Sequence, residues 1–364
     1  MKIGQKTLEI PIIQGGMGVG VSLSGLAGAV ASCGGMGVIS SVNIGYKEPD
    51  FMKHPLETNL KVLKNEIRRA KSIANGKGLV AVNIMTAVSN YAKTCEAAIE
   101  AGVDAIISGA GLPLKLPEFT RGTSTLCIPI VSSARAAKLL ATSFIKKWQT
   151  IPDMFIIEGY KAGGHLGFSK EELTEGTAME NDEILKEVLE VTKEIEKTQK
   201  KHIPVAVAGG VFDGNDMGHI MSLGAEAVQI GTRFIATDEC DASLAFKNAI
   251  VNAREEDIQI ISSPVGMPAR AIKSPMLERL KNGERFHALR CNGCLTSCKK
   301  DDSIPYCISR ALIEAVKGNW EDGLFFTGSN GARVDKIVPV KELMEEIIGG
   351  YRQYCRSMNM EEQF

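Results

Sequence analysis

The segment Met154–Gly167, MFIIEGYKAGGHLG, joins a short apolar run to a pair of glycines and a histidine. An apolar run of this length, bounded by turn residues, predicts a buried β-strand. Glycines after a strand let the backbone approach a ligand closely, because they carry no Cβ. We therefore expect Gly163 and Gly164 to line a binding site, with His165 beside it as a titratable group. A tight turn followed by a surface histidine is the plainer alternative, because so short a motif also arises by chance.

Similar apolar runs recur along the first 230 residues, and the segments between them have helical periodicity, clearest in Asn59–Ala74 and Asp182–Lys197. Strands separated by ten or more helical residues are expected to lie parallel, joined by right-handed crossovers. The sequence thus predicts an α/β fold, a (β/α)₈ TIM barrel, with an open doubly wound sheet as the alternative. The eight expected strands are Ile10–Ile13, Gly37–Ser41, Leu79–Ile84, Ala105–Ser108, Ile128–Ser132, Met154–Ile157, Val205–Ala208 and Ala227–Ile230.

We expect the barrel to occupy residues 1–255 and a Cys-rich covering extension with C-terminal helices to occupy residues 256–364. Ile258–Ser274 contains Pro264 and Pro268 and is expected to be an irregular covering segment. This segment and Ser41–Leu56 are both long enough to act as lids.

Charge and hydropathy exclude several classes of partner. A net charge of −1 and a pI of about 6.6 give no basic surface for nucleic acid or an anionic membrane. No signal peptide is apparent, and no apolar run approaches the roughly 18 residues that a membrane span needs. We expect a cytoplasmic protein without nucleic-acid or membrane partners, and the oligomeric state stays open, with a homodimer as one option.

Glycines follow the seventh and eighth predicted strands, where this kind of barrel commonly holds phosphate. Gly209 and Gly210 come after one strand, and Gly231 and Thr232 come after the next. Backbone amides there and the Thr232 hydroxyl would bind an anion. These residues predict a phosphorylated ligand but leave open whether it is a flavin mononucleotide, a purine mononucleotide or a sugar phosphate; the alternative is that they only form tight turns.

Five segments together resemble the nitronate monooxygenases, formerly called 2-nitropropane dioxygenases, and the related bacterial FMN-dependent enoyl-acyl-carrier-protein reductases. They are PIIQGGMG at Pro11–Gly18, VAVNIM at Val80–Met85, EGYKAGGHLG at Glu158–Gly167, VAVAGGVFDG at Val205–Gly214 and GAEAVQIGTRFIATDEC at Gly224–Cys240. The resemblance covers roughly residues 1–275. Of these segments, the one with Gly-Gly-His separates this family from inosine-monophosphate-dehydrogenase-like barrels.

The resemblance implies bound FMN and places His165 at the family's catalytic histidine, which assists oxidation of an anionic nitronate by the flavin. It implies cofactor contacts from Gly15, Gly16, Met17, Asn83, Glu158, Gly163, Gly164, Gly209, Gly210, Gln229, Ile230, Gly231 and Thr232. Two positions depart from the family pattern: Lys161 replaces the usual glutamate, and Glu158 replaces the usual glutamine. An exchange of charge between the two positions is one explanation.

Four cysteines with the spacing C-x₂-C-x₃-C-x₈-C lie at Cys291, Cys294, Cys298 and Cys307. Such density in a cytoplasmic chain predicts a metal site, either a [4Fe–4S] cluster or zinc, with unligated thiols as the alternative. The spacing is similar to the cluster segment of flavin barrels of the trimethylamine-dehydrogenase and dienoyl-CoA-reductase type. The other five cysteines are expected to be small buried side chains.

The leading hypothesis is an FMN-dependent nitronate monooxygenase that oxidises alkyl nitronates with O₂. The alternative is an NAD(P)H-dependent FMN reductase of enoyl thioesters, with an iron–sulfur relay as an option. Two further alternatives are a non-redox phosphate-binding barrel and an electron-transfer or sensory protein whose working part is the cysteine segment.

Overall fold

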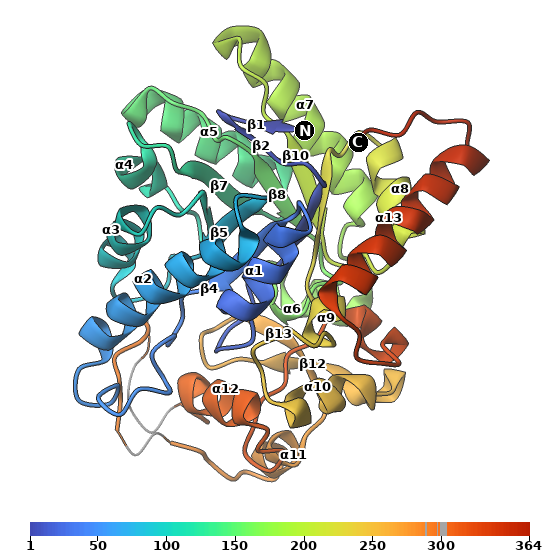
Figure 1. Ribbon diagram of the computed structural model, residues 1–364. Helices are drawn as coiled ribbons and strands as arrows, with labels where there is room; N and C mark the ends of the chain where they lie inside the picture. The colour runs from blue at the N-terminus through green and yellow to red at the C-terminus, as the bar shows by residue number, and fades with distance from the viewer. Residues whose placement is uncertain (288–289, 297, 299–303) are drawn as a thin grey trace.

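The structure, a computed structural model, describes residues 1–287, 290–296, 298 and 304–364. Eight parallel strands close into a barrel in the order β10, β11, β3, β4, β5, β6, β7, β8 (Figure 1). The predicted TIM barrel is confirmed, and the open sheet is excluded. The barrel strands are β3 (Ile12–Gln14), β4 (Met36–Ser40), β5 (Leu79–Asn83), β6 (Ala105–Ser108), β7 (Leu126–Val131), β8 (Phe155–Glu158), β10 (Val205–Ala208) and β11 (Ala227–Ile230).

The barrel strands are buried on both faces, which explains why they are apolar without alternation. Ile13, Val38 and Ile156 belong to the cluster that fills the barrel interior, whereas their neighbours Ile39 and Ile157 pack in the larger cluster with the surrounding helices. A short hairpin of β1 (Lys2–Ile3) and β2 (Lys6–Thr7) lies at the end of the barrel away from the extension.

Helices surround the barrel, and several begin at side-chain caps that the sequence supplies. Ser133 accepts a hydrogen bond from the amide of Ala136, and Asp213 and Asp216 form a capping box at the start of α8. In chain order the helices up to residue 251 are α1 (Ser24–Ser32), α2 (Pro55–Ala74), α3 (Tyr91–Glu100), α4 (Leu116–Thr120), α5 (Ala134–Trp148), α6 (Lys170–Glu175), α7 (Asn181–Gln199), α8 (Gly214–Ser222), α9 (Thr232–Ile235) and α10 (Leu244–Val251). Of these, α10 lies below the barrel in Figure 1, with the C-terminal extension.

The C-terminal extension gathers at the other end of the barrel, below it in Figure 1, except for the last helix, which runs along the side of the barrel against α8 and α1. Its elements are η1 (Glu255–Asp257), α11 (Pro275–Lys281), α12 (Ile308–Lys317), η2 (Ser329–Arg333) and α13 (Val340–Ser357).

The expectation of an irregular segment at Ile258–Ser274 is wrong. β12 (Ile258–Ser262) and β13 (Pro268–Ile272) form an antiparallel hairpin, to which β9 (Gly164–His165) adds a third strand. The prolines are compatible with this hairpin, because Pro264 lies in its turn and Pro268 is the first residue of a strand. The hairpin therefore joins the extension directly to the segment that carries the histidine.

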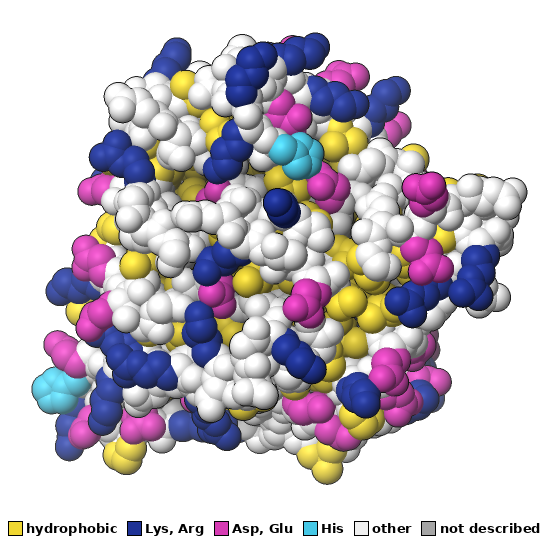
Figure 2. Space-filling model, turned by 45° about the horizontal axis from the view of Figure 1, so that its top comes forward, with side chains coloured by type: hydrophobic (Ala, Val, Ile, Leu, Met, Phe, Trp, Pro, Cys, Tyr) yellow, Lys and Arg dark blue, Asp and Glu magenta, His cyan; other side chains and the backbone are white. Residues whose placement is uncertain are grey.

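The surface matches the nearly neutral net charge. On the face drawn in Figure 2, basic and acidic side chains are interspersed, without a large area of one sign. Within the described part of the chain, no helix combines the length and the apolar character that a membrane crossing requires.

Candidate functional site

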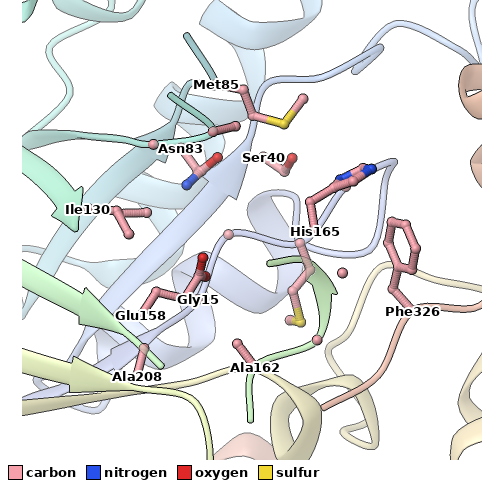
Figure 3. Close-up of a pocket in the computed structure, with 18 of the residues that line it drawn as sticks. Gly15, Ser40, Asn83, Met85, Ile130, Glu158, Ala162, His165, Ala208 and Phe326 are labelled. Atoms are coloured by element: carbon pink, nitrogen blue, oxygen red, sulfur yellow. The ribbon is translucent and has the colours of Figure 1, made fainter. Parts of the chain in front are cut away.

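A cavity of about 580 Å³ opens at the carboxyl ends of the barrel strands. Because the strands are parallel, the residues at their ends converge on it from all round the barrel (Figure 3). Nearly all the predicted cofactor residues line this cavity: Gly15, Gly16, Met17, Asn83, Glu158, Gly163, Gly164, Gly209, Gly210, Gln229, Gly231 and Thr232, together with His165. Ile230 does not, because its side chain is buried in the core; its carbonyl accepts a hydrogen bond from the Gly15 amide.

One side of the cavity has the features of an anion cradle. Gly209 and Gly210 both have positive φ, +86° and +96°, a conformation that side chains disfavour. The Thr232 hydroxyl accepts a hydrogen bond from the Gly328 amide at 2.9 Å, which leaves its own hydrogen free to donate. Asn330 Nδ2 donates to the Gly210 carbonyl at 2.7 Å. Gly328 and Asn330 come from the extension and were not predicted, because no local motif marks them.

His165 lies in β9, positioned by its neighbours on both sides. Gly164 has a φ of +73°, and His165 pairs in register with Ala269 of β13. The imidazole Nε2 lies 2.7 Å from Ser263 Oγ, and the ring packs edge-on against Phe326, with centroids 5.3 Å apart. Burial lowers the pKa of His165 to about 4, so the imidazole is neutral near pH 7. It is therefore suited to accept a proton or to donate a neutral hydrogen bond, rather than to provide a fixed positive charge.

Glu158 ends β8 and points into the cavity near Gly15 and Ala208. Among the residues that the structure describes, none forms a hydrogen bond or an ion pair with its carboxyl group. Burial raises the pKa of Glu158 to about 7.

Lys161 lines the cavity, but its ion-pair partner is Glu180 rather than Glu158. Its Nζ lies 2.9 Å from Glu180, which also accepts a hydrogen bond from the Tyr160 hydroxyl at 2.5 Å. Burial disfavours the charge of Lys161, but the hydrogen bond that its ammonium group donates to Glu180 outweighs this effect and raises the pKa of Lys161. Lys161 and Glu158 therefore do not form an ion pair with each other, because the partner of Lys161 is Glu180.

The extension contributes a wall to the cavity. Leu295 forms an antiparallel bridge with Val88, and this pairing is extended by hydrogen bonds from the Ser89 amide to the Cys294 carbonyl and from the Thr296 amide to the Ala87 carbonyl. The wall is mainly apolar, formed by Val265, Met267, Leu295, Ile308, Leu312, Leu324 and Phe326. The four-residue spacing of Ile308 and Leu312 indicated one apolar helix face, but not what that face would cover.

The geometry does not support the predicted metal site. Within the described ranges, no three His, Cys, Asp or Glu side chains are grouped so that they could hold a metal ion. Cys291 is exposed, and the other three thiols are partly buried. Burial, with smaller contributions from the other three cysteines, raises the pKa of Cys294 to about 11, so these cysteines lie near it without forming a ligand set. Residues 297 and 299–303, which flank Cys298, lie outside the described residues.

Three comparisons with known proteins agree with this geometry. Residues 1–350 match the family model described as nitronate monooxygenase. A probable nitronate monooxygenase of Staphylococcus saprophyticus is 28% identical, over 86% of this chain and 85% of its own length. A hydroxy-methyl-oxo-octahydro-indene-carboxyl-CoA dehydrogenase of Mycobacterium tuberculosis is 24% identical, over 94% of this chain and 92% of its own length.

Two solved structures share the fold over nearly the whole chain. FabK from Thermotoga maritima is 26% identical and superposes with a TM-score of 0.72, covering 97% of this chain and 96% of its own. A nitroalkane oxidase from Streptomyces ansochromogenes, 21% identical, shares the fold with a TM-score of 0.71, over 96% of this chain and 98% of its own. Since the family model spans nearly the whole chain, this protein belongs to the nitronate monooxygenase family and is an oxidoreductase.

Proposed function

We propose that this protein is an FMN-dependent monooxygenase that oxidises alkyl nitronates with molecular oxygen. The observation that carries the proposal is a neutral histidine, His165, at the cavity of a nitronate monooxygenase barrel. Membership of an oxidoreductase family removes the non-redox phosphate-binding alternative.

The residues of the cavity fit FMN. The positive φ of Gly209 and Gly210 and the free hydroxyl hydrogen of Thr232 suit the phosphate group. Gly15 and Gly231 line the cavity without a side chain, which leaves room for a ligand beside Gln229 and Met17. When bound, FMN would supply the redox chemistry, the passage of electrons from the nitronate to oxygen.

The charges of the cavity do not oppose an anionic substrate below pH 7. Glu158 and His165 are both largely neutral below pH 7, so neither a carboxylate nor an imidazolium dominates the site. The Lys161 and Arg233 cations are balanced by Glu180 and Glu346. His165 could then accept a proton from the substrate or donate a hydrogen bond to it. The apolar wall would keep water away from the substrate.

The test compares His165→Ala with the wild type and with His219→Ala, a surface histidine paired with Asp182 outside the cavity. We expect all three proteins to be yellow and to contain similar amounts of FMN. Oxygen consumption with propyl-2-nitronate should fall at least 100-fold in His165→Ala alone, as expected for loss of an acid–base group. A colourless wild type would contradict FMN dependence, and a fully active His165→Ala protein would contradict the role of the histidine.

A second candidate is the NAD(P)H-dependent reduction of an enoyl thioester. The apolar wall of Leu295, Ile308 and Leu312 favours it, because a substrate with a hydrocarbon chain would cover this surface. FabK and the CoA-ester dehydrogenase are similar over most of the chain. Rapid anaerobic bleaching of the flavin by NADH or NADPH, without turnover of nitronates, would select this function over the first.

A further inference from the structure

The carboxyl group of Glu158 is an acid that faces the cavity without a partner. The end of β8 fixes its place, since Glu158 pairs in register with Ala208 of β10. The strand on the other side, β7, contributes the apolar side chain of Ile130 to the cavity. In the described structure no cation, hydroxyl or amide compensates the carboxylate, and a buried charge left in this way is unfavourable.

Four other ionisable side chains line the same cavity, from the elements packed around Glu158. Lys161 follows β8 and is paired with Glu180, and Arg233 of α9 is paired with Glu346. His165 of β9 has a pKa of about 4 and Cys294 of the extension one of about 11, so both stay uncharged near neutral pH. Among the described residues that line the cavity, Glu158 is therefore the group that changes its charge near pH 7.

We propose that Glu158 contacts FMN as a neutral carboxylic acid and takes up a proton when FMN binds above neutral pH. The inference rests on the proposed function only in taking FMN as the ligand. The inference goes beyond the proposed function because it concerns proton uptake. The glutamine that the resemblance leads us to expect at this position could contact FMN in a similar way, but it could not take up a proton.

The direction of the effect follows from electrostatics. A bound FMN would place a phosphate with close to two negative charges in the cavity and would exclude water from Glu158. Both changes disfavour the carboxylate. Donation of a hydrogen bond from a ribityl hydroxyl to a carboxylate would act in the opposite direction, so the sign of proton exchange decides between the two arrangements.

The test is calorimetric titration of FMN into the full-length protein stripped of flavin, at pH 7.5 and 8.5, in buffers of different ionisation enthalpy. With a pKa of about 7, Glu158 is about three quarters ionised at pH 7.5, so wild type should take up about 0.75 proton more than Glu158→Gln if FMN binding fully protonates the carboxylate. The dissociation constant of wild type should rise about eightfold from pH 7.5 to 8.5, and that of Glu158→Gln should stay nearly constant. Titration with riboflavin, which lacks the phosphate, tests whether the proton binds to Glu158 or to the phosphate.

A second measurement uses the flavin-loaded protein as purified. The infrared spectrum of wild type at pH 7.5 should contain a carboxylic-acid carbonyl band that shifts in D₂O and is missing from Glu158→Gln. Equal proton uptake in both proteins, proton release, or the absence of that band would overturn the inference while leaving FMN binding intact. Failure of both proteins to bind FMN would instead overturn the proposed function, and the inference with it.

Discussion

The hydrogen bond between His165 and Ser263 can be removed without removing the imidazole. It therefore allows the effect of the ring's orientation on activity to be measured separately from the effect of losing the ring. Ser263 is buried in the turn between β12 and β13, and its Oγ lies 2.7 Å from Nε2. Among the described residues, this is the one hydrogen bond that the ring makes. Ser263→Ala removes it and leaves the packing of Phe326 against the ring in place.

The expected size of the effect follows from the kind of bond. A neutral hydrogen bond contributes a net free energy of about 1 kcal/mol. If that energy holds the ring in its reactive orientation, its loss lowers kcat about fivefold, since 1.4 kcal/mol corresponds to roughly tenfold. KM should change little, because the apolar wall that would hold the substrate is untouched. The low pKa of His165 also predicts that wild-type kcat shows no titration near pH 6.5.

The assay is steady-state oxidation of propyl-2-nitronate, with kcat and KM determined separately and FMN content measured for each protein. Ser263→Thr keeps a hydroxyl at this position and should restore most of kcat. Nitrogen NMR of His165 should show one dominant tautomer in wild type and a mixture in Ser263→Ala. An unchanged kcat together with an unchanged tautomer in Ser263→Ala would refute the reasoning.

Three further predictions concern the cradle, the loop before the histidine and a surface pair. Gly210→Ala, at a φ of +96°, should cost about 1–2 kcal/mol in urea unfolding and weaken FMN binding measured by fluorescence. Arg270→Met removes two 2.6 Å hydrogen bonds to carbonyls of the segment 160–162, so urea unfolding should show a loss of about 3 kcal/mol, with Arg270→Lys intermediate. Burial works against protonation of His202, but Glu226 and Glu196 outweigh it and raise its pKa. Its stabilising contribution is thus complete below pH 6.5 and lost as the pH rises through the folded-state pKa, and His202→Gln should flatten that part of the curve of unfolding free energy against pH.

The barrel could be predicted from the sequence because each strand carries its signal locally. Val205–Ala208 and Ala227–Ile230 are apolar runs bounded by turn residues, and both are strands with the expected bounds. The glycines that follow them line the cavity for the same reason, since a parallel strand always delivers the residue after its end to one face of the barrel.

The partners of the site could not be predicted, because they are distant in the sequence. Ser263 lies 98 residues after His165, and the carbonyls that Arg270 binds lie 108 and 110 residues before it. No periodicity or motif in the sequence predicts that β13 pairs with β9. The prolines of the β12–β13 hairpin even pointed away from a strand, although one lies in the turn and the other at a strand start, where neither removes a needed amide.

Lys161 and Glu158, the two charged residues that depart from the family pattern, show that a motif alone does not determine the charge of a site. From the sequence, Lys161 and Glu158 are two departures of opposite charge, which an exchange between the two positions could explain. In the structure Lys161 is neutralised by Glu180, which lies outside the motif, next to α7. Glu158 is consequently without a counter-ion, and the lower-cost state of an isolated buried carboxyl is the protonated one. Below pH 7 the lining of the cavity therefore contains a Lys161 cation that is already paired and a Glu158 carboxyl group that is mainly neutral, an arrangement that the motif alone does not reveal.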